Sequence, residues 1–263
     1  SKSRGLGDVY KRQIYYMKFN LTTIVSCLVL FLAIWLCLIQ SNTSTQSFEG
    51  AWERNHFSKE GVELKSIVIF SKSHQVFTTY ESLTGKFIYS NGGTWKLNNN
   101  IMTEKVEFDT NDSSRVGSII SFDVEIRDST MSIVGSDMNF KRIDDGSPGK
   151  LNGAWLMSTR FRDGIKQFRD TTKPRKTMKI LSGTRFQWIA YNTETKKFMG
   201  TGGGTYSSVG GDYVENIEFF SRDNSRVGVS LKFNFELLDK KWEHKGFSSK
   251  GNPVHEIWSK RDN

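Results

Sequence analysis

The sequence predicts an all-β protein in which two small antiparallel up-and-down β-barrels lie in tandem after an N-terminal signal segment. Three observations lead to this prediction. A long stretch of the chain occurs twice at a constant spacing, and apolar and polar residues alternate with a period of two in both copies. No stretch beyond the N-terminal segment has convincing helical periodicity. Such alternation is typical of antiparallel strands with one buried face.

The repeat relates residues 87–117 to residues 198–228, always 111 positions later and without a gap. Each copy also opens with Gly-Ala-Trp and closes on a basic pair. The residues identical in both copies are, in first-copy numbers, Phe87, Gly92, Gly93, Thr94, Glu104, Glu107, Phe108, Asp112, Ser114, Arg115, Val116 and Gly117. Two related units of roughly 100 residues are therefore expected.

Each unit is predicted to contain eight short strands separated by turn-forming residues. In the first unit they are expected at 50–56, 67–70, 76–80, 86–95, 103–108, 120–126, 131–134 and 139–143. In the second unit they are expected at 153–160, 176–182, 185–191, 197–206, 213–220, 227–238, 241–245 and 254–261. Closure into a barrel removes the exposed edges of such a sheet, and a flattened sandwich is the main alternative. The paired glycines Gly92 and Gly93, and the run 202–204, are placed where a barrel strand needs a sharp bend.

The N-terminal segment is expected to lie outside both barrels. Residues 1–16 have no apolar periodicity and resemble translated adapter sequence. Residues 17–44 resemble a secretory signal, because the basic Lys18 is followed by the apolar run 24–39 and then by small polar residues. Cleavage with export to the periplasm or the outside of a bacterial cell is favoured over an uncleaved membrane anchor, because the run is shorter than the roughly 20 residues that span a bilayer.

Removal of this segment changes the chemistry that remains. Both cysteines, Cys27 and Cys37, lie within it, so the mature chain would have neither a disulfide nor a thiol nucleophile. Lipidation at Cys37 is the weaker alternative, since Leu36 precedes it where a small residue is needed. Residues 1–44 hold five of the 37 Lys and Arg residues and one of the 28 Asp and Glu residues, so the net charge falls from +9 to +5. Such a modest charge argues against nucleic-acid binding.

The boundary between the units is predicted at 144–150, a cluster of turn formers and charged residues that reads as a linker. The first barrel is expected at 48–144 and the second at 151–262. If each unit has its own core, proteolysis should cut this linker first and leave two folded fragments.

A Gly-x-Trp at the first strand together with a basic residue in the last strand resembles the lipocalin and calycin barrels, and Gly-Gly-Thr before an aromatic resembles the lipocalin-like domains of secreted bacterial proteins. The resemblance covers both units, although lipocalins proper are longer. It implies a tryptophan packed across one barrel end with a basic side chain stacked over it, as a structural feature. By position these are Trp52 with Arg142 or Lys141, and Trp155 with Arg261 or Lys260.

A noncatalytic role in binding a small apolar or amphipathic ligand is the function expected from this resemblance and from the high aromatic content. The expected ligand-binding residues are Phe77, Trp95, Phe108 and Phe122 in the first copy and Trp188, Tyr206, Phe219 and Phe233 in the second, although they could simply form the cores. An envelope interaction module with filled barrels is the alternative, and a calycin-like isomerase is the second alternative. No cofactor is expected.

The charged residues shared by both copies are better explained by structure than by catalysis. Glu104 and Glu107, like their counterparts in the second copy, lie on opposite faces of one strand, so they should not act on a common bond. Asp112 and Ser114 are expected to satisfy backbone amides in a turn. The four histidines show no ligand spacing, which argues against a metal site.

The two copies differ most between Arg160 and Lys179, where the second has eight extra residues and many cations. A solvated loop explains this composition, but a position over a barrel mouth would favour an anionic ligand.

Overall fold

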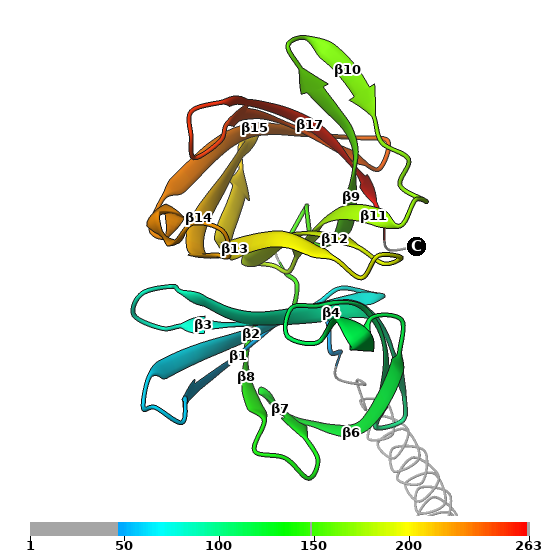
Figure 1. Ribbon diagram of the computed structural model, residues 1–263, viewed down its shortest axis with the longest axis vertical. Helices are drawn as coiled ribbons and strands as arrows, with labels where there is room; N and C mark the ends of the chain where they lie inside the picture. The colour runs from blue at the N-terminus through cyan, green and yellow to red at the C-terminus, as the bar shows by residue number, and fades with distance from the viewer. Residues whose placement is uncertain (1–46, 148, 262–263) are drawn as a thin grey trace, which may run out of the picture. The chain divides into compact units, whose positions relative to one another are not determined.

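Two closed eight-stranded antiparallel barrels follow one another along the chain in the computed structural model, which describes residues 47–147 and 149–261 (Figure 1). The expected leader and signal segments at 1–16 and 17–44 lie outside the described residues. Barrel 1 contains β1 (Gly50–Phe57), β2 (Glu63–Phe70), β3 (His74–Glu81), β4 (Phe87–Asn98), β5 (Ile101–Asp109), β6 (Ile119–Arg127), β7 (Thr130–Ile133) and β8 (Asn139–Asp144). Because β1 pairs with both β2 and β8, the sheet closes, and the sandwich alternative is wrong.

Barrel 2 repeats this order and adds one strand. It contains β9 (Gly153–Arg162), β11 (Arg175–Leu181), β12 (Arg185–Asn192), β13 (Phe198–Val209), β14 (Asp212–Phe220), β15 (Ser230–Leu238), β16 (Lys241–Phe247) and β17 (Pro253–Lys260), and it closes through the pairing of β9 with β17. The extra strand β10 (Ile165–Phe168) forms a hairpin with β9 that extends beyond the closed sheet (Figure 1). Sequence reasoning did not predict this strand, which lies within the cation-rich insertion.

Short 3-10 turns, η1 (Ser113–Arg115) and η2 (Asn224–Arg226), follow β5 and β14. Asp112 begins η1, and its carboxylate accepts a hydrogen bond from the backbone N–H of Ser114 at 2.9 Å, as expected for this turn. Residues 47–147 and 149–261 contain no helix with the length and hydropathy needed to cross a bilayer.

The paired glycines make the sharp bends of β4 and β13. Gly92 pairs with Phe108 while Gly93 pairs with Val106, so Glu107 forms a β-bulge between them. A Cβ on Gly93 would lie 1.9 Å from the carbonyl oxygen of Lys105, so only glycine allows the two strands to approach this closely.

The two barrels share an apolar core between them, and the described residues group as one compact unit. Phe108 of barrel 1 packs on Tyr191 at 5.1 Å between ring centroids, and the equivalent residues, Phe219 and Tyr80, pack at 5.0 Å. Phe87 stacks on its own counterpart, Phe198. Each contact is therefore repeated with the copies exchanged, which is the property of a two-fold interface within a single chain.

The segment between the barrels is tied to barrel 2 rather than free. The carboxylate of Asp144 accepts hydrogen bonds from the hydroxyl of Ser182 at 2.8 Å, from the backbone N–H of Gly183 at 3.0 Å and from Thr184 at 2.6 and 3.0 Å. This network and the shared core predict that the two barrels unfold together, although each also has a core of its own.

Candidate functional site

A pocket of about 290 Å³ lies inside barrel 1. Its volume is at the small end of the range of roughly 300–1,000 Å³ that is usual for sites holding small organic ligands. The apolar lining residues are Val68, Phe70, Phe77, Met102, Ile120, Phe122, Val124, Met131, Ile133, Met138 and Phe140, and the polar ones are Gln75, Tyr89, Asn91, Glu104 and Arg115. An apolar wall with a few polar groups is the usual composition of a binding site for a small molecule.

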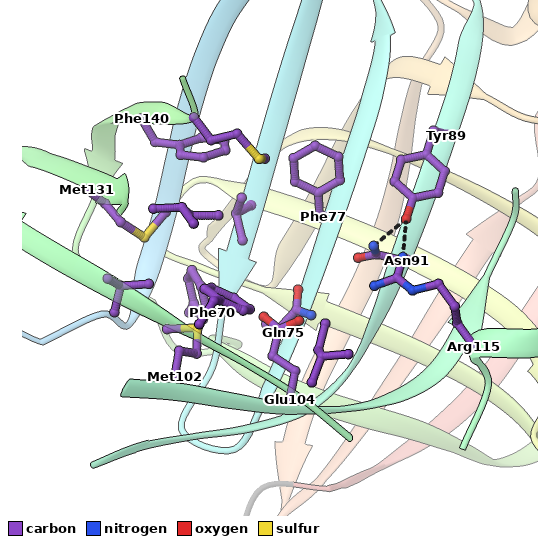
Figure 2. A pocket seen from close by; sticks show the side chains of 16 residues that line it. Phe70, Gln75, Phe77, Tyr89, Asn91, Met102, Glu104, Arg115, Met131 and Phe140 are labelled. Atoms are coloured by element: carbon purple, nitrogen blue, oxygen red, sulfur yellow. Dashed lines mark hydrogen bonds between the residues drawn. The ribbon is translucent and has the colours of Figure 1, made fainter. Parts of the chain in front are cut away.

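Figure 2 shows that the polar side chains lie apart from Met131 and Phe140. One polar group joins Tyr89, Asn91 and Arg115, because the Tyr89 hydroxyl accepts hydrogen bonds from both the Asn91 amide and the Arg115 guanidinium. Arg115 also forms an ion pair with the buried Asp109 at 2.7 Å. The positive charge of Arg115 is therefore already compensated within the protein.

Glu104 is the second polar feature of the pocket. Its carboxylate bonds with the side chain of Gln75, and no described residue forms an ion pair with it. Burial raises the pKa of Glu104 to about 7, and the charge of Arg115 and the Gln75 hydrogen bond offset only part of that effect. The pocket thus contains a carboxyl group that changes its charge near neutral pH.

Among the described residues of barrel 2, large side chains occupy the equivalent position. Its core includes Phe186, Tyr213, Phe233, Trp242 and Trp258. The buried ammonium of Lys179 lies among four of these rings and pairs with Glu215 at 2.7 Å. The fully buried His244 stacks on Phe233 at 4.8 Å and bonds with Glu256.

The strand register explains why one barrel is hollow and the other filled. Met131 pairs with Phe140 in barrel 1, where Trp242 pairs with Trp258 in barrel 2. Other lining positions at which barrel 2 has the larger side chain, given from barrel 1 to barrel 2 at the 111-residue offset, include Met102 to Tyr213, Ile133 to His244, Gln75 to Phe186, and Val68 to Lys179. The smaller side chains of barrel 1 at these equivalent positions leave the volume that forms its pocket.

Only two of the eight predicted ligand-binding residues, Phe77 and Phe122, line the pocket. Trp95 instead packs on Phe48 and Phe70 at the barrel end, and its indole N–H donates to the carbonyl of Ser71 at 2.9 Å.

Phe108 and Phe219 belong to the core between the barrels and do not line the pocket of barrel 1. The bulge at Glu107 is the physical reason why Phe108 faces barrel 2 rather than the pocket. It shifts the alternation of β5 by one residue, and the register shift between Gly203 and Gly204 does the same for Phe219 on β14.

Trp188, Tyr206 and Phe233 pack in the filled interior of barrel 2. Trp188 lies beside Phe220, and the Tyr206 hydroxyl donates to the carbonyl of Ser182 at 2.6 Å. They are core residues in the described structure.

The tryptophans implied by the family resemblance occupy equivalent places. The indole N–H of Trp52 donates to the carbonyl of Phe48 at 2.9 Å, and that of Trp155 donates to Leu151 at 2.8 Å. The guanidinium of Arg142 lies 4.0 Å from the ring centroid of Trp52. In the second barrel the expectation for Arg261 is corrected, because Lys260 is the cation over Trp155, at 4.5 Å.

Arg261 instead joins the barrels. Its guanidinium donates to Glu107 at 2.6 Å and to the hydroxyl of Tyr191 at 2.9 Å, and that hydroxyl donates to Glu107 at 2.5 Å. Glu107 therefore faces barrel 2 while Glu104 faces the pocket, on opposite faces of β5 as the alternation predicts. In the second copy Glu215 is likewise inside, and Glu218 bonds to Tyr80 across the interface.

The cation-rich segment lies on β9, β10, the connection that follows β10, and β11, and none of its residues lines the pocket of barrel 1. Lys179 is buried, and Arg169 donates to the hydroxyl of Thr177 at 3.3 Å. Among the described residues, no group of three or more His, Cys, Asp or Glu is placed to hold a metal ion.

Sequence reasoning missed the methionines and most of the polar groups of the pocket. The signal that could have found them is the comparison of the two copies, since Met102 and Met131 stand where the second copy has Tyr213 and Trp242.

Fold and pocket together define a protein of two tandem eight-stranded antiparallel barrels, one hollow and one filled, which is an arrangement consistent with a lipocalin-like fold. The sequence profile of a family described as a domain of unknown function (DUF4488) matches residues 150–262, the whole of barrel 2. No curated protein sequence matches the chain.

Proposed function

We propose that this chain is an exported, noncatalytic binding protein that holds a small, mostly apolar molecule with one polar group inside barrel 1. The observation that carries the proposal is the pocket of about 290 Å³, which is largely apolar and has its polar groups apart from Met131 and Phe140. The resemblance to lipocalin-like domains and the signal-like segment at 17–44 support the same role. Barrel 2, in this proposal, stabilises barrel 1 and has no ligand of its own.

The lining suits a ligand of modest size and affinity. Met102, Met131 and Met138 are flexible and polarisable, so they can adapt to an apolar body. Each methylene group buried there contributes about 0.8 kcal/mol. A chain of about eight carbons would gain roughly 6 kcal/mol, which would correspond to a dissociation constant of about 40 μM before the costs of association are subtracted.

Binding is favoured over catalysis because the ionisable groups are not arranged as an acid and a base. Glu104 and Glu107 face opposite sides of β5, and Arg115 is already paired with Asp109. A pair of groups that acts on one bond has to reach the same atoms.

The proposal is tested by filling barrel 1 with the side chain that fills barrel 2. We expect Met131→Trp to reduce the binding of the neutral probe naphthalene at least tenfold, as measured by equilibrium dialysis. Leu238→Trp, at an exposed position of β15, is the matched control and should leave binding unchanged. Phe140→Trp is a second way to fill the pocket if Met131→Trp does not fold, since overpacking can cost about 1–3 kcal/mol. Equal probe binding in a folded filled variant and in the control would contradict the proposal.

A second role, contact with another envelope component, is favoured by the β9–β10 hairpin. Ile165 and Phe168 of β10 are 66% and 76% exposed, and the ammonium of Lys166 lies 4.7 Å from the Phe168 ring. A photo-crosslinking amino acid at Phe168 should then capture one defined protein in intact cells. The same amino acid at Leu83, exposed on barrel 1, is the control. Identical products from both positions would count against this role.

A further inference from the structure

Barrel 2 contains an internal example of what the glutamate of barrel 1 can bind. Glu215 occupies the position equivalent to Glu104, and it pairs with the ammonium of Lys179 at 2.7 Å. That ammonium lies 4.9 to 5.8 Å from the ring centroids of Tyr213, Phe233, Trp242 and Trp258. An alkylammonium group is thus held by one carboxylate and a wall of aromatic rings inside the barrel, where both the charge pairing and the cation–π contacts stabilise it.

Barrel 1 retains the carboxylate and lacks the lysine. The strand ladders place Val68 opposite Phe77 in barrel 1 and Lys179 opposite Trp188 in barrel 2, so Val68 is the counterpart of Lys179. Val68 lines the pocket together with Glu104. The volume taken by an alkylammonium side chain in one barrel is therefore part of the cavity in the other.

The charged groups around the pocket compensate Glu104 only in part. Arg115 is neutralised by Asp109, and the remaining polar lining groups, Gln75, Asn91 and Tyr89, are uncharged at neutral pH. One added positive charge would give barrel 1 the same balance that Lys179 gives barrel 2. An added carboxylate would face Glu104 without a free cation to receive it, so the pocket disfavours the anionic ligand considered from the sequence.

We infer that barrel 1 selects a small molecule that carries a protonated amine on an apolar body, with the ammonium on Glu104 and the body against Met102, Met131 and Phe140. This inference rests on the proposed binding function and names the ligand class for that site. The raised pKa of Glu104 agrees with it, because a bound ammonium would favour the ionised carboxylate.

Three compounds of equal chain length test this inference. Octylamine, octan-1-ol and octanoate have similar apolar bodies, and at roughly 30 Å³ for each heavy atom they match the volume of the pocket. By displacement of naphthalene at pH 8, we expect octylamine to bind at least tenfold more tightly than octan-1-ol, and octanoate to bind most weakly. Glu104→Gln should reduce the affinity for octylamine to that for octan-1-ol.

Two further measurements separate a charge effect from a change in packing. Val68→Lys would place an internal ammonium beside Glu104, as in barrel 2, and should weaken octylamine binding at least tenfold, whereas Val68→Met, which adds volume without charge, should weaken the amine and the alcohol equally. Affinity for octylamine should rise between pH 5 and pH 8 and stay flat in Glu104→Gln, because the amine, like a lysine with a pKa of about 10.4, remains protonated throughout. The groups that act on Glu104 are Arg115 and Gln75, and neither type of side chain ordinarily titrates between pH 5 and pH 8.

The outcomes distinguish the two proposals. If the probe binds but the alcohol or octanoate binds as tightly as the amine, the ligand class is wrong and the binding function stands. If neither the probe nor any of the three compounds binds the folded protein, the binding function is wrong and this inference falls with it.

Discussion

Replacement of Glu107 by alanine should destabilise the protein more than the same change at its counterpart in the second copy, Glu218. Glu107 is buried between the barrels, where its side chain is 14% exposed and its partner Arg261 is 12% exposed. Removal of the carboxylate leaves the Arg261 guanidinium buried without a counter-charge. Breaking a buried ion pair in this way costs about 3–5 kcal/mol in the free energy of unfolding.

Glu218 is the matched control because it also bonds to a tyrosine and an arginine, but its arginine partner has a second carboxylate nearby. It accepts hydrogen bonds from Tyr80 at 2.6 Å and from Arg185 at 2.5 Å, and its side chain is 29% exposed. Arg185 also lies 3.7 Å from Glu53, so it keeps a carboxylate after Glu218→Ala. We expect a loss of about 1–2 kcal/mol in this variant.

Urea denaturation followed by tryptophan fluorescence measures both losses. Burial by itself raises the pKa of Glu107, but the charge and hydrogen bonds of Arg261 outweigh it, so the pKa lies below its usual value. The stabilisation by Glu107 is therefore fully present above about pH 4.3, the ordinary value for a glutamate, and is lost as the pH falls through the lower pKa of the folded state. The difference between wild type and Glu107→Ala should shrink at acid pH. Equal losses in the two alanine variants at pH 7 would refute the reasoning.

Three further predictions concern the barrel ends, the pocket and the linker. Trp52→Ala and Trp155→Ala should each lower the free energy of unfolding by about 3–5 kcal/mol in urea titrations, since each removes a large buried aromatic side chain. Mild effects in both variants would place these residues outside the core. Glu104→Gln should stabilise the unliganded protein at pH 8 by up to about 3 kcal/mol and have little effect below pH 4.5. The reason is that wild type loses stability as the pH rises through the raised pKa of Glu104. A difference in thermal denaturation that does not depend on pH would contradict this. Cleavage at a protease site inserted after Gly146 should leave both fragments eluting together in gel filtration, because they share an apolar core; separate elution would show that the core between the barrels is weak.

Local patterns were sufficient for much of the fold. The alternation of apolar residues and the 111-residue repeat correctly predict two antiparallel eight-stranded barrels, and the paired glycines correctly mark the bends. These features are readable because the side-chain period of a strand and the steric demand of a close strand contact act within a few residues. The strand β10 escaped prediction because its four residues are all exposed and have no alternation.

The sequence by itself determined the repeat, the strands and the opposite orientations of Glu104 and Glu107. Only the tertiary structure decided that barrel 1 is hollow, that barrel 2 is filled, and that Phe108 packs between them. The physical reason is that a pocket depends on the summed volumes of side chains from many strands, and a shared core depends on which outer faces meet. A strand's own pattern shows which residues share a face, but a single bulge can shift the alternation so that later residues change face. Neighbours distant in sequence then decide whether the face is buried, paired or open.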